Sequence, residues 1–345
     1  MTIFEKLNHR GHRVTQSEAT EAMLSGTRLG WIEQIRIMFV GRVLISGASG
    51  LIGSALVSAL EGRGDTVIRL TRRLPEKANE VQWDPMREIP PEFVSGYDIV
   101  VHLSGENVAG LWTENKKQRI RESRVVSTRN LAQALIRAEK PPARFLCASA
   151  IGYYGNRGDE ILTEESTSGR GFLPEVCREW EAAAEPALQA GIGVVNLRFG
   201  IVLSRTGGAL KQMLLPFRLG LGGRIGSGRQ WWSWIHISDV VRAVTHVLDE
   251  AAGRGRPAPH DRVSGPVNMV APNPITNAEF TRVLASALRR PALLPVPLFA
   301  IRFAFREFAD EGLLASACVM PKRLVESGFE FRYAELEMAL AQLLT

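Results

Sequence analysis

The chain has 345 residues, of which 45% are hydrophobic and 23% are charged, and these proportions are ordinary for a soluble globular protein. This length allows one large hydrophobic core, with or without a smaller lobe. The net charge of +6 raises the question of nucleic acid, but basic residues are dispersed and interleaved with acidic ones, as in RIRESR (119–124). A dispersed positive balance is typical of a solvated surface, so we expect no nucleic-acid partner.

Residues 1–38 differ from the rest of the chain, because they carry mixed charges and a helical pattern around Glu18 to Met38 but no strand pattern. Met38 stands directly before the first predicted strand. A natural start at Met38, a remnant of another domain and a disordered tail are alternative interpretations. Each of them makes residues 1–38 an accessory N-terminal extension.

From residue 42, short apolar runs alternate with helical patterns. The predicted strands are RVLIS (42–46), TVIRL (66–70), DIVVHL (98–103), RFLCAS (144–149) and VVNLRF (194–199). Between them, stretches such as RVVSTRNLAQALIRA (124–138) repeat apolar residues at intervals of three and four, as a helix does. Buried-type strands that alternate with helices predict an α/β fold of Rossmann type, with a doubly wound parallel sheet, and we assign residues 39–250 to it.

Beyond residue 250 the pattern changes. GRGRPAPHDRVSGP predicts a loop, and NAEFTRVLASALRR (277–290) and YAELEMALAQLL (333–344) predict helices, so we expect residues 251–345 to form a small, mainly helical C-terminal lobe. The longest apolar stretch, PALLPVPLFAIRFAF (291–305), holds three prolines and Arg302. It is too short and too broken to span a bilayer, and we expect no membrane partner.

The cysteines and the first residues indicate the compartment. Cys147, Cys177 and Cys318 are scattered and show no C-x-x-C spacing, which argues against a disulfide framework or a metal site such as zinc and suits a reducing environment. The opening MTIFEKLNHRGHR lacks the continuous apolar core of a signal peptide. We therefore expect a cytoplasmic protein.

A glycine-rich turn, SGASGLIG (46–53), comes after the first strand of the regular pattern and precedes a helix. Gly47, Gly50 and Gly53 allow a tight turn and a close backbone approach to a diphosphate, and the N–H groups that begin the helix favour an anion. With a strand before it and an amphipathic helix after it, the turn predicts a dinucleotide site. The alternative is that the glycines serve only the turn and its packing.

The end of the second strand distinguishes the two nicotinamide cofactors. NAD sites usually place Asp or Glu there to bind ribose hydroxyl groups, whereas here Thr71, Arg72 and Arg73 stand without an acid. A guanidinium holds a 2′-phosphate by charge-assisted hydrogen bonds, so we predict NADP(H), with Arg72 as the main contact. The alternative is an ordinary surface arginine.

The third strand ends in HLSGEN (102–107) at the same edge of the sheet. Ser104 and Gly105 are small enough to let a cofactor pass close to the backbone. The alternative is a simple loop.

These motifs, in this order, resemble the extended short-chain dehydrogenase/reductases, and more narrowly the atypical, YfcH-like branch of epimerase family proteins. The matching pieces are SGASGLIG, LTRR, QWDP (82–85), HLSGENVAG, ESR (122–124), SAIGYYG (149–155), EWEAAAE (179–185), LRFGIVLSRTGGAL (197–210), PFRLGLGGRIGSGRQWWSWIHISD (216–239), NPITNAEF and GFEF. The resemblance covers nearly all of the chain after residues 1–38, and its last part resembles the C-terminal domain of unknown function of this branch.

The resemblance implies a set of NADP(H) contacts along the carboxyl edge of the sheet. The implied cofactor-binding residues are Gly47, Ser49, Gly50, Leu51, Ile52 and Gly53 in the turn, Arg72 at the 2′-phosphate, Leu103, Ser104 and Gly105 beside the cofactor, and Arg124 from the helix of the ESR motif.

The superfamily usually transfers a proton with a tyrosine whose pKa is lowered by a lysine four residues later. Aligning Glu185 with an acid that often comes after that pair puts Cys177 at the tyrosine and Glu181 at the lysine. The carboxylate would oppose formation of a thiolate, so this pair cannot do the same chemistry. Cys177 is then a small buried residue, and Glu181 either pairs with a neighbour such as Arg178 or faces the cleft as a base.

Other proton donors stand near the end of the strand RFLCAS. Ser149 ends that strand, and Tyr153 and Tyr154 come after it at the edge where ligands gather. We therefore name Ser149, Tyr153, Tyr154 and Glu181 as candidate catalytic residues. The alternatives are a register that places Ala150 at the serine position of related enzymes, and a packing role for the tyrosine rings.

The segment LGLGGRIGSGRQWWSWIH (219–236) is the expected substrate-facing part of a loop over residues 200–236. Its glycines allow motion, and Gln230, Trp232 and His236 offer polar and stacking surface. The alternatives are a hydrophobic seal made by the tryptophans and a structural role for His236.

The predicted function is that of an NADP(H)-dependent oxidoreductase or epimerase, a monomer or homodimer, acting on a small molecule such as a nucleotide sugar or another carbonyl compound. The lost tyrosine–lysine pair favours an alternative, a protein that holds NADPH without turnover as a redox sensor or scaffold. The glycine-rich turn and the polar cleft favour the enzyme.

Overall fold

The computed structural model describes residues 6–7, 13–14, 41–251, 263–292 and 294–345. The chain divides into two units, Met1–Val40 and Gly41–Thr345. In the first unit, β1 (Lys6–Leu7) and β2 (Arg13–Val14) pair antiparallel, which the sequence pattern does not indicate. The helix expected around Glu18 to Met38 lies outside the described residues.

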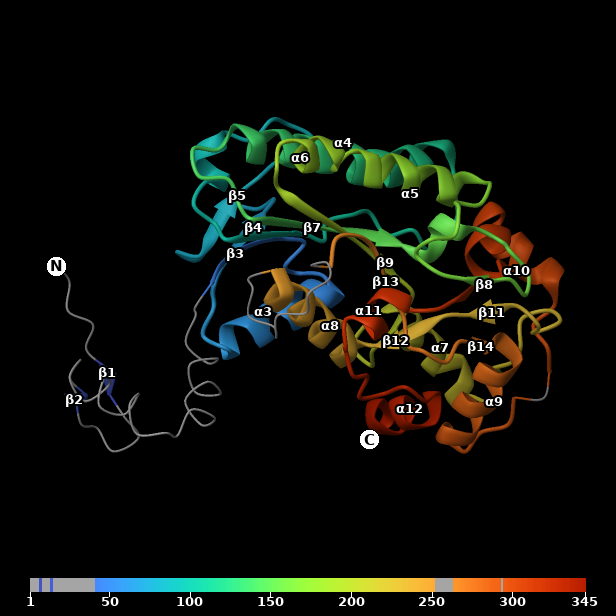
Figure 1. Cartoon of the computed structure of the whole chain (residues 1–345). Coiled ribbons are helices and arrows are strands. Elements are labelled where there is room, and N and C mark those ends of the chain that lie inside the picture. The colour runs from blue at the N-terminus through green and yellow to red at the C-terminus, as the bar shows by residue number, and fades with distance from the viewer. Residues whose placement is uncertain (1–5, 8–12, 15–40, 252–262, 293) are drawn as a thin grey trace. The chain divides into compact units, whose positions relative to one another are not determined.

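Among the described residues, the second unit is built on a seven-stranded parallel sheet (Figure 1). Its strands are β3 (Arg42–Ser46), β4 (Thr66–Thr71), β5 (Glu80–Gln82), β6 (Ile99–His102), β7 (Arg144–Ala150), β9 (Gly193–Phe199) and β13 (Gly265–Met269). Their spatial order is β5-β4-β3-β6-β7-β9-β13, and each neighbouring pair is parallel. The order reverses between β3 and β6, and doubly wound sheets bind ligands at the carboxyl ends of the strands at such a switch point.

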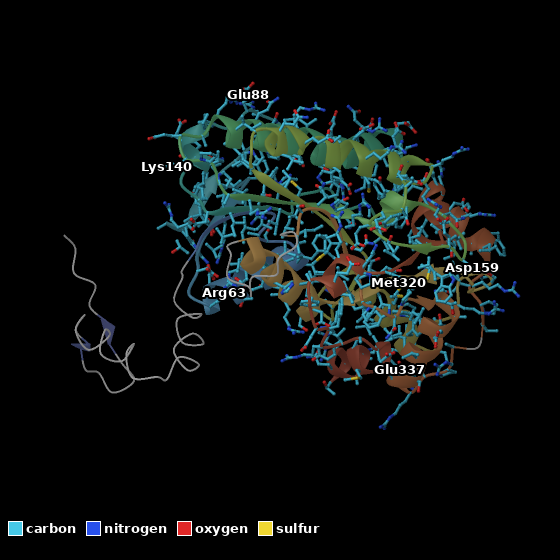
Figure 2. All side chains as sticks on the ribbon, in the orientation of Figure 1. Arg63, Glu88, Lys140, Asp159, Met320 and Glu337 are labelled. Atoms are coloured by element: carbon cyan, nitrogen blue, oxygen red, sulfur yellow. The ribbon has the colours of Figure 1, made fainter. Side chains whose placement is uncertain are left out.

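Helices cover both faces of the sheet (Figure 1), and side chains fill the space between the layers (Figure 2). One face carries α3 (Leu51–Gly62) and α8 (Ile237–Ala251), and the other carries α4 (Glu114–Arg137), α5 (Phe172–Ala182) and α6 (Glu185–Gln189). In β3, Val43 and Ile45 pack with the first group and Leu44 with the second. This alternation results from the two-residue period of a strand.

A smaller lobe holds two short strand pairs, β10 with β12 and β11 with β14, and a core that includes Trp234 and Phe280. Its elements are β10 (Ile201–Leu203), α7 (Gly208–Arg218), β11 (Trp231–Trp232), β12 (Trp234–His236), β14 (Ile275–Thr276), α9 (Asn277–Leu288) and α12 (Leu336–Leu344). The remaining elements are η1 (Pro91–Val94), η2 (Ile151–Tyr154), β8 (Ile161–Leu162), α10 (Leu298–Phe305), η3 (Ala309–Leu313), β15 (Cys318–Val319) and α11 (Lys322–Glu326). In the described ranges, every helix is too short or too polar to cross a bilayer.

The predicted Rossmann-type sheet and the helical C-terminal region are confirmed, but the sequence pattern misses two strands of this sheet. β5 has only three residues, and β13 reads GPVNM, with one β-branched residue after Gly and Pro. Neither segment shows alternation or a long apolar run. Because β13 pairs with β9, the sheet continues beyond the boundary expected at residue 250.

Candidate functional site

The turn after β3 is shaped by its glycines. Gly47 has a φ of 71°, in the left-handed region that favours glycine, and a Cβ there would lie 2.7 Å from the carbonyl carbon of Leu103. A Cβ on Gly53, in the first turn of α3, would lie 2.2 Å from the carbonyl oxygen of Gly47. The turn therefore accepts no side chain at Gly47 or Gly53, and it meets the end of β6 at the switch point.

The start of α3 suits an anion. The helix begins directly after Gly50, and no side chain in the described ranges caps it. The first N–H groups of a helix have no partner within the helix and carry a partial positive charge, which favours a diphosphate. The contacts expected in the turn all lie within residues 47–53, namely Gly47, Ser49, Gly50, Leu51, Ile52 and Gly53.

Two arginines stand directly after β4, the strand next to β3. Arg72 and Arg73 are exposed, and neither forms an ion pair with another described residue. The Thr71 hydroxyl accepts a hydrogen bond from the Arg73 backbone N–H at 3.2 Å, which fixes the turn. The guanidinium groups thus leave their charge available to an anion near the glycine turn.

The turn after β6 carries Ser104 and Gly105. A Cβ on Gly105 would lie 3.3 Å from the guanidinium carbon of Arg124. Arg124 donates to the carbonyl oxygen of Glu106 at 3.0 Å and lies over the ring of Trp180, 5.0 Å from its centroid. Burial lowers the pKa of this guanidinium. Arg124 therefore anchors the turn to α4 through contacts within the protein.

His102, the last residue of β6, is buried beside the glycine turn. Its Nδ1 lies 2.5 Å from the Ser46 hydroxyl oxygen and its Nε2 lies 3.1 Å from that of Ser127. Burial lowers the pKa of the imidazole to about 3, so His102 is neutral at physiological pH. Its contacts with Ser46 and Ser127 link β6 to β3 and α4 next to the glycine turn.

A buried ion pair lies at the carboxyl ends of β7 and β9. Arg198 donates from Nε and Nη2 to the two carboxylate oxygens of Glu181, both at 2.8 Å. Their side chains are 3% and 13% exposed, so the pair is shielded from water. Ser149 donates to the same carboxylate at 2.6 Å. Burial opposes the charge of Arg198, but Glu181 outweighs burial and the pKa of the guanidinium is raised.

The rings of both tyrosines lie against this guanidinium and pack edge to face with each other. The Tyr154 hydroxyl is buried, accepts from Arg198 at 3.0 Å and donates to the Asn268 side chain at 2.8 Å. Tyr153 is half-buried, and the centroid of its ring lies 3.6 Å from the Arg198 guanidinium carbon. No described residue bonds to the Tyr153 hydroxyl. The four candidate catalytic residues, Ser149, Tyr153, Tyr154 and Glu181, thus surround Arg198.

Cys177 lies one turn before Glu181 on α5 and is buried. Burial and the nearby Glu181 raise the pKa of its thiol to about 12, so it stays protonated at neutral pH. Arg178, the expected partner of Glu181, instead donates to the Ser168 hydroxyl at 3.1 Å. The structure therefore favours a packing role for Cys177.

The candidate substrate-facing side chains are engaged within the small lobe. Gln230 donates to a backbone carbonyl at 3.2 Å, and Trp232 packs edge-on against Phe280 with ring centroids 5.2 Å apart. His236 Nε2 lies 2.9 Å from the side-chain oxygen of Gln342, and burial lowers the pKa of its imidazole. All three side chains are buried.

Sequence reasoning misses Arg198 and Asn268. An arginine inside the apolar strand run VVNLRF is a usable signal, because a buried guanidinium requires a partner. Asn268 gives no such signal, since it stands on β13, a strand that the pattern does not reveal.

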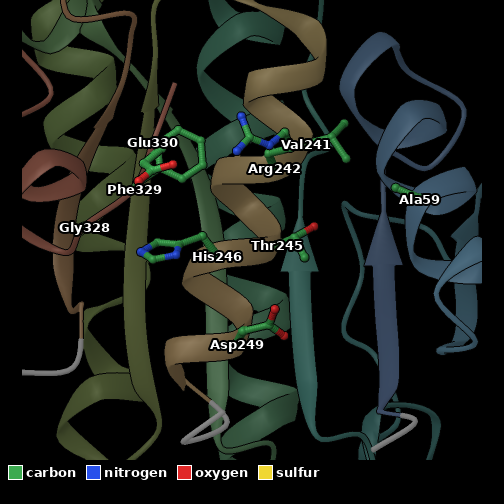
Figure 3. A pocket seen from close by; sticks show the side chains of 9 residues that line it. All are labelled: Ala59, Val241, Arg242, Thr245, His246, Asp249, Gly328, Phe329 and Glu330. Atoms are coloured by element: carbon green, nitrogen blue, oxygen red, sulfur yellow. The ribbon is translucent and has the colours of Figure 1, made fainter. Parts of the chain in front are cut away.

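A groove of about 470 Å³ lies away from this site, between α8 and the segment 328–330 (Figure 3). Arg242 lies over the ring of Phe329, 5.3 Å from its centroid, and His246 Nε2 lies 2.9 Å from the Ser327 hydroxyl. The groove lies beside α8, and the Arg242 and His246 side chains that line it already have partners, so we do not assign it to the site.

A doubly wound parallel sheet with a glycine turn at its switch point defines a dinucleotide-binding protein of Rossmann type. Residues 43–258 match the NAD dependent epimerase/dehydratase family, and residues 296–343 match a domain of unknown function, DUF1731. The chain belongs to the NAD dependent epimerase/dehydratase family. The resemblance to the extended short-chain dehydrogenase/reductases of the epimerase family, with a C-terminal domain of unknown function, is confirmed.

Similar proteins cover nearly the same span. An epimerase family protein of Mycobacterium bovis is 43% identical over 300 residues, which are 86% of this chain and 96% of that protein. The crystal structure of human epimerase family protein SDR39U1 (isoform 2) with NADPH has 34% identity and a TM-score of 0.77, and the match covers 88% of this chain and 98% of that one. The crystal structure of a nucleoside-diphosphate sugar epimerase from Corynebacterium glutamicum has 33% identity and a TM-score of 0.72. The match covers 99% of this chain and 69% of that one.

Proposed function

We propose that this chain binds NADP(H) across the glycine turn and is an oxidoreductase or epimerase acting on a carbonyl or alcohol group of a small molecule. The observation that carries the proposal is the pair of glycines, Gly47 and Gly53, that leave no room for a Cβ at the switch point. A backbone without side chains allows a diphosphate to approach closely. The human relative crystallised with NADPH supports the same cofactor.

The preference for the phosphorylated cofactor depends on Arg72 and Arg73. They are exposed at the end of β4, and no acid stands beside them to bind ribose hydroxyl groups. A guanidinium is always charged and matches a phosphate in geometry, so a 2′-phosphate is the expected partner. We assign the main contact to Arg72.

We assign the proton donor to Tyr153. When bound, NADPH supplies a hydride to a carbonyl carbon, and a nearby group has to protonate the oxygen. The Ser149 hydroxyl already donates its hydrogen bond to Glu181, and the Tyr154 hydroxyl donates its hydrogen bond to Asn268. Tyr153 is half-buried at the carboxyl edge of the sheet, and no described residue forms a hydrogen bond with its hydroxyl. The Arg198 guanidinium, held by Glu181, lies against one face of its ring.

The substrate class that we propose is a nucleotide sugar or another carbonyl compound. The similarity to a nucleoside-diphosphate sugar epimerase supports this class. We propose the cytoplasm as the compartment, because all three cysteines are free and buried. We propose a monomer or a homodimer as the functional form.

A second candidate function is a protein that holds NADPH without turnover, as a redox sensor or scaffold. Its support is the replacement of the usual tyrosine–lysine pair by Cys177, a thiol with a pKa of about 12, and Glu181, which is locked by Arg198. Neither group supplies a proton as the usual pair does.

One experiment separates the two candidates. Protein loaded with NADPH is mixed with nucleotide sugars and other carbonyl metabolites, and nicotinamide absorbance and sugar products are measured over time. We expect consumption or epimerisation that falls by about 100-fold or more in Tyr153→Phe, since general acid catalysis contributes that much. Tight NADPH binding without turnover of any compound would support the sensor, and a fully active Tyr153→Phe enzyme would remove Tyr153 from the mechanism.

A further inference from the structure

Helix α10 (Leu298–Phe305) places aromatic rings on the outside of the molecule. Its sequence is LFAIRFAF, and none of its eight residues is buried. Phe299 and Phe303, one turn apart, are 77% and 88% exposed. On the opposite side of the helix, Ile301 and Phe305 are half-buried, and Phe305 packs with Phe308. The helix is therefore docked by one side and presents phenyl rings on the other.

The chain beside α10 extends this apolar surface. The Val296 N–H donates to the Arg224 carbonyl at 2.8 Å, so the segments 219–226 and 294–298 run next to each other. Three leucines on these segments are largely exposed. Together with the two phenylalanines they form what we call the α10 face: Leu219, Leu221, Leu294, Phe299 and Phe303. Isolated exposed apolar residues are common, but a contiguous group indicates an interaction surface.

The same part of the chain carries the positive charge of the protein. The segments 204–230 and 286–306 hold nine of the 42 basic residues and none of the 36 acidic ones. The rest of the chain therefore has 33 basic against 36 acidic residues, and the net charge of +6 comes from these two segments alone. Arg218, Arg289, Arg290 and Arg306 are exposed. These four arginines stand next to the residues of the α10 face in the chain, whereas Arg302 of α10 itself pairs with Asp310.

A second copy of the chain does not suit this surface. A two-fold interface would bring the same basic segments of both copies together, and like charges would repel. A partner of opposite charge is required. Rings exposed to 77% and 88% project from the surface, so a folded protein would need matching pockets, whereas the interfacial layer of a bilayer accepts any projecting apolar group.

We propose that the α10 face binds the surface of an anionic lipid bilayer. Phe299 and Phe303, with the three leucines, enter the interfacial layer, and the surrounding arginines interact with anionic headgroups. Apolar burial combined with attraction to anionic lipid is the general basis of binding by interfacial helices. The stretch 291–305 is too short and broken to span a bilayer, but lying on the surface requires neither length nor continuity.

The test is co-sedimentation of the full chain with vesicles of phosphatidylcholine alone, or of phosphatidylcholine with about one third phosphatidylserine. We expect binding to the anionic vesicles only. The double variant Phe299→Gln with Phe303→Gln should weaken the partition coefficient by about tenfold or more, because each ring loses its burial in the interface. The control Leu188→Gln with Met338→Gln removes two exposed apolar side chains elsewhere and should bind as the wild type does.

Charge is tested separately. Arg289→Glu with Arg290→Glu should also weaken binding by about tenfold or more, since each basic group near an anionic surface contributes appreciably. Lys77→Glu with Lys140→Glu makes the same change in net charge at exposed positions elsewhere and should have a much smaller effect. Circular dichroism verifies that all variants are folded.

Four results would overturn the proposal. They are absence of binding to either vesicle, equal binding to neutral vesicles, loss of binding by charge reversal without any effect of the phenylalanine variants, and concentration-dependent self-association that those variants abolish. The last would assign the face to a second copy.

Discussion

Arg198 is the residue around which the candidate catalytic groups are arranged. Its guanidinium makes two bonds to Glu181 and one to Tyr154, and its flat side lies under the ring of Tyr153. With three hydrogen bonds and an aromatic ring against it, this cation has little freedom to move. Its first effect is to fix the positions of the surrounding hydroxyl and carboxylate groups, whatever chemistry they perform.

The ion pair makes a prediction about stability. Glu181→Gln keeps the shape but leaves the buried Arg198 without a counter-charge, so we expect the free energy of unfolding in urea to fall by about 3–5 kcal/mol. Glu160→Gln breaks a pair with Arg157 that water reaches more easily, since the side chains are 48% and 24% exposed, and it should cost less than about 1 kcal/mol. Equal losses for the two variants would show that the buried pair has no special role.

His102 makes a prediction about pH. Burial depresses the pKa of the folded imidazole from 6.5 to about 3, so between these values the unfolded chain binds one proton more than the folded chain. The contribution of His102 to the free energy of unfolding is fully present above pH 6.5. Below pH 6.5 this contribution falls by about 1.4 kcal/mol per pH unit. We expect His102→Gln to have a shallower fall in the free energy of unfolding between pH 6 and pH 4.5. Parallel curves for variant and wild type would contradict this assignment.

At the scale of elements, the turn and the helix start of the β3–α3 connection need glycine for different reasons. Gly47 supplies a positive φ, and Gly53 allows the helix to approach the turn. The motif in the sequence indicates both roles, because they depend on neighbours a few residues away.

This connection makes the third prediction. Gly53→Ala places a Cβ against the Gly47 carbonyl and should abolish detectable NADPH binding in a fluorescence titration, because the turn has to open. Gly62→Ala, at the other end of α3, meets no atom within 4 Å and should bind normally. Normal binding by Gly53→Ala would show that the turn is not the cofactor site.

The central strands β3, β4, β6, β7 and β9 could be predicted because buried parallel strands are continuous apolar runs. β13 could not, because GPVNM becomes a strand only through pairing with β9. The same limit applies to the site. The glycine turn is local, whereas the bonds of Arg198 join residues on β9, α5, η2 and, through Tyr154, β13. Such pairings depend on the tertiary fold.

At the scale of the second unit, both halves of the proposed reaction lie at one edge of the sheet. The glycine turn and Arg72 lie at the ends of β3 and β4, and the cluster around Arg198 lies at the ends of β7 and β9. Parallel strands bring these ends together, so a cofactor lying across the switch point would extend toward Tyr153. The α10 face is formed by residues 219–221 and 294–303, which include none of the proposed cofactor contacts, so membrane attachment and cofactor binding can be tested with different variants.

The most direct test of the proposed cofactor site is titration calorimetry of the folded chain with NADPH and NADH. We predict heat with NADPH, a weaker response with NADH, and a roughly 10- to 150-fold rise in the NADPH Kd in Arg72→Glu, as loss of a charged hydrogen bond implies. Arg282→Glu, an exposed arginine on α9, should bind like the wild type. Absence of heat with either cofactor would contradict the proposed site, and an unchanged Kd in Arg72→Glu would contradict the assignment of the 2′-phosphate contact.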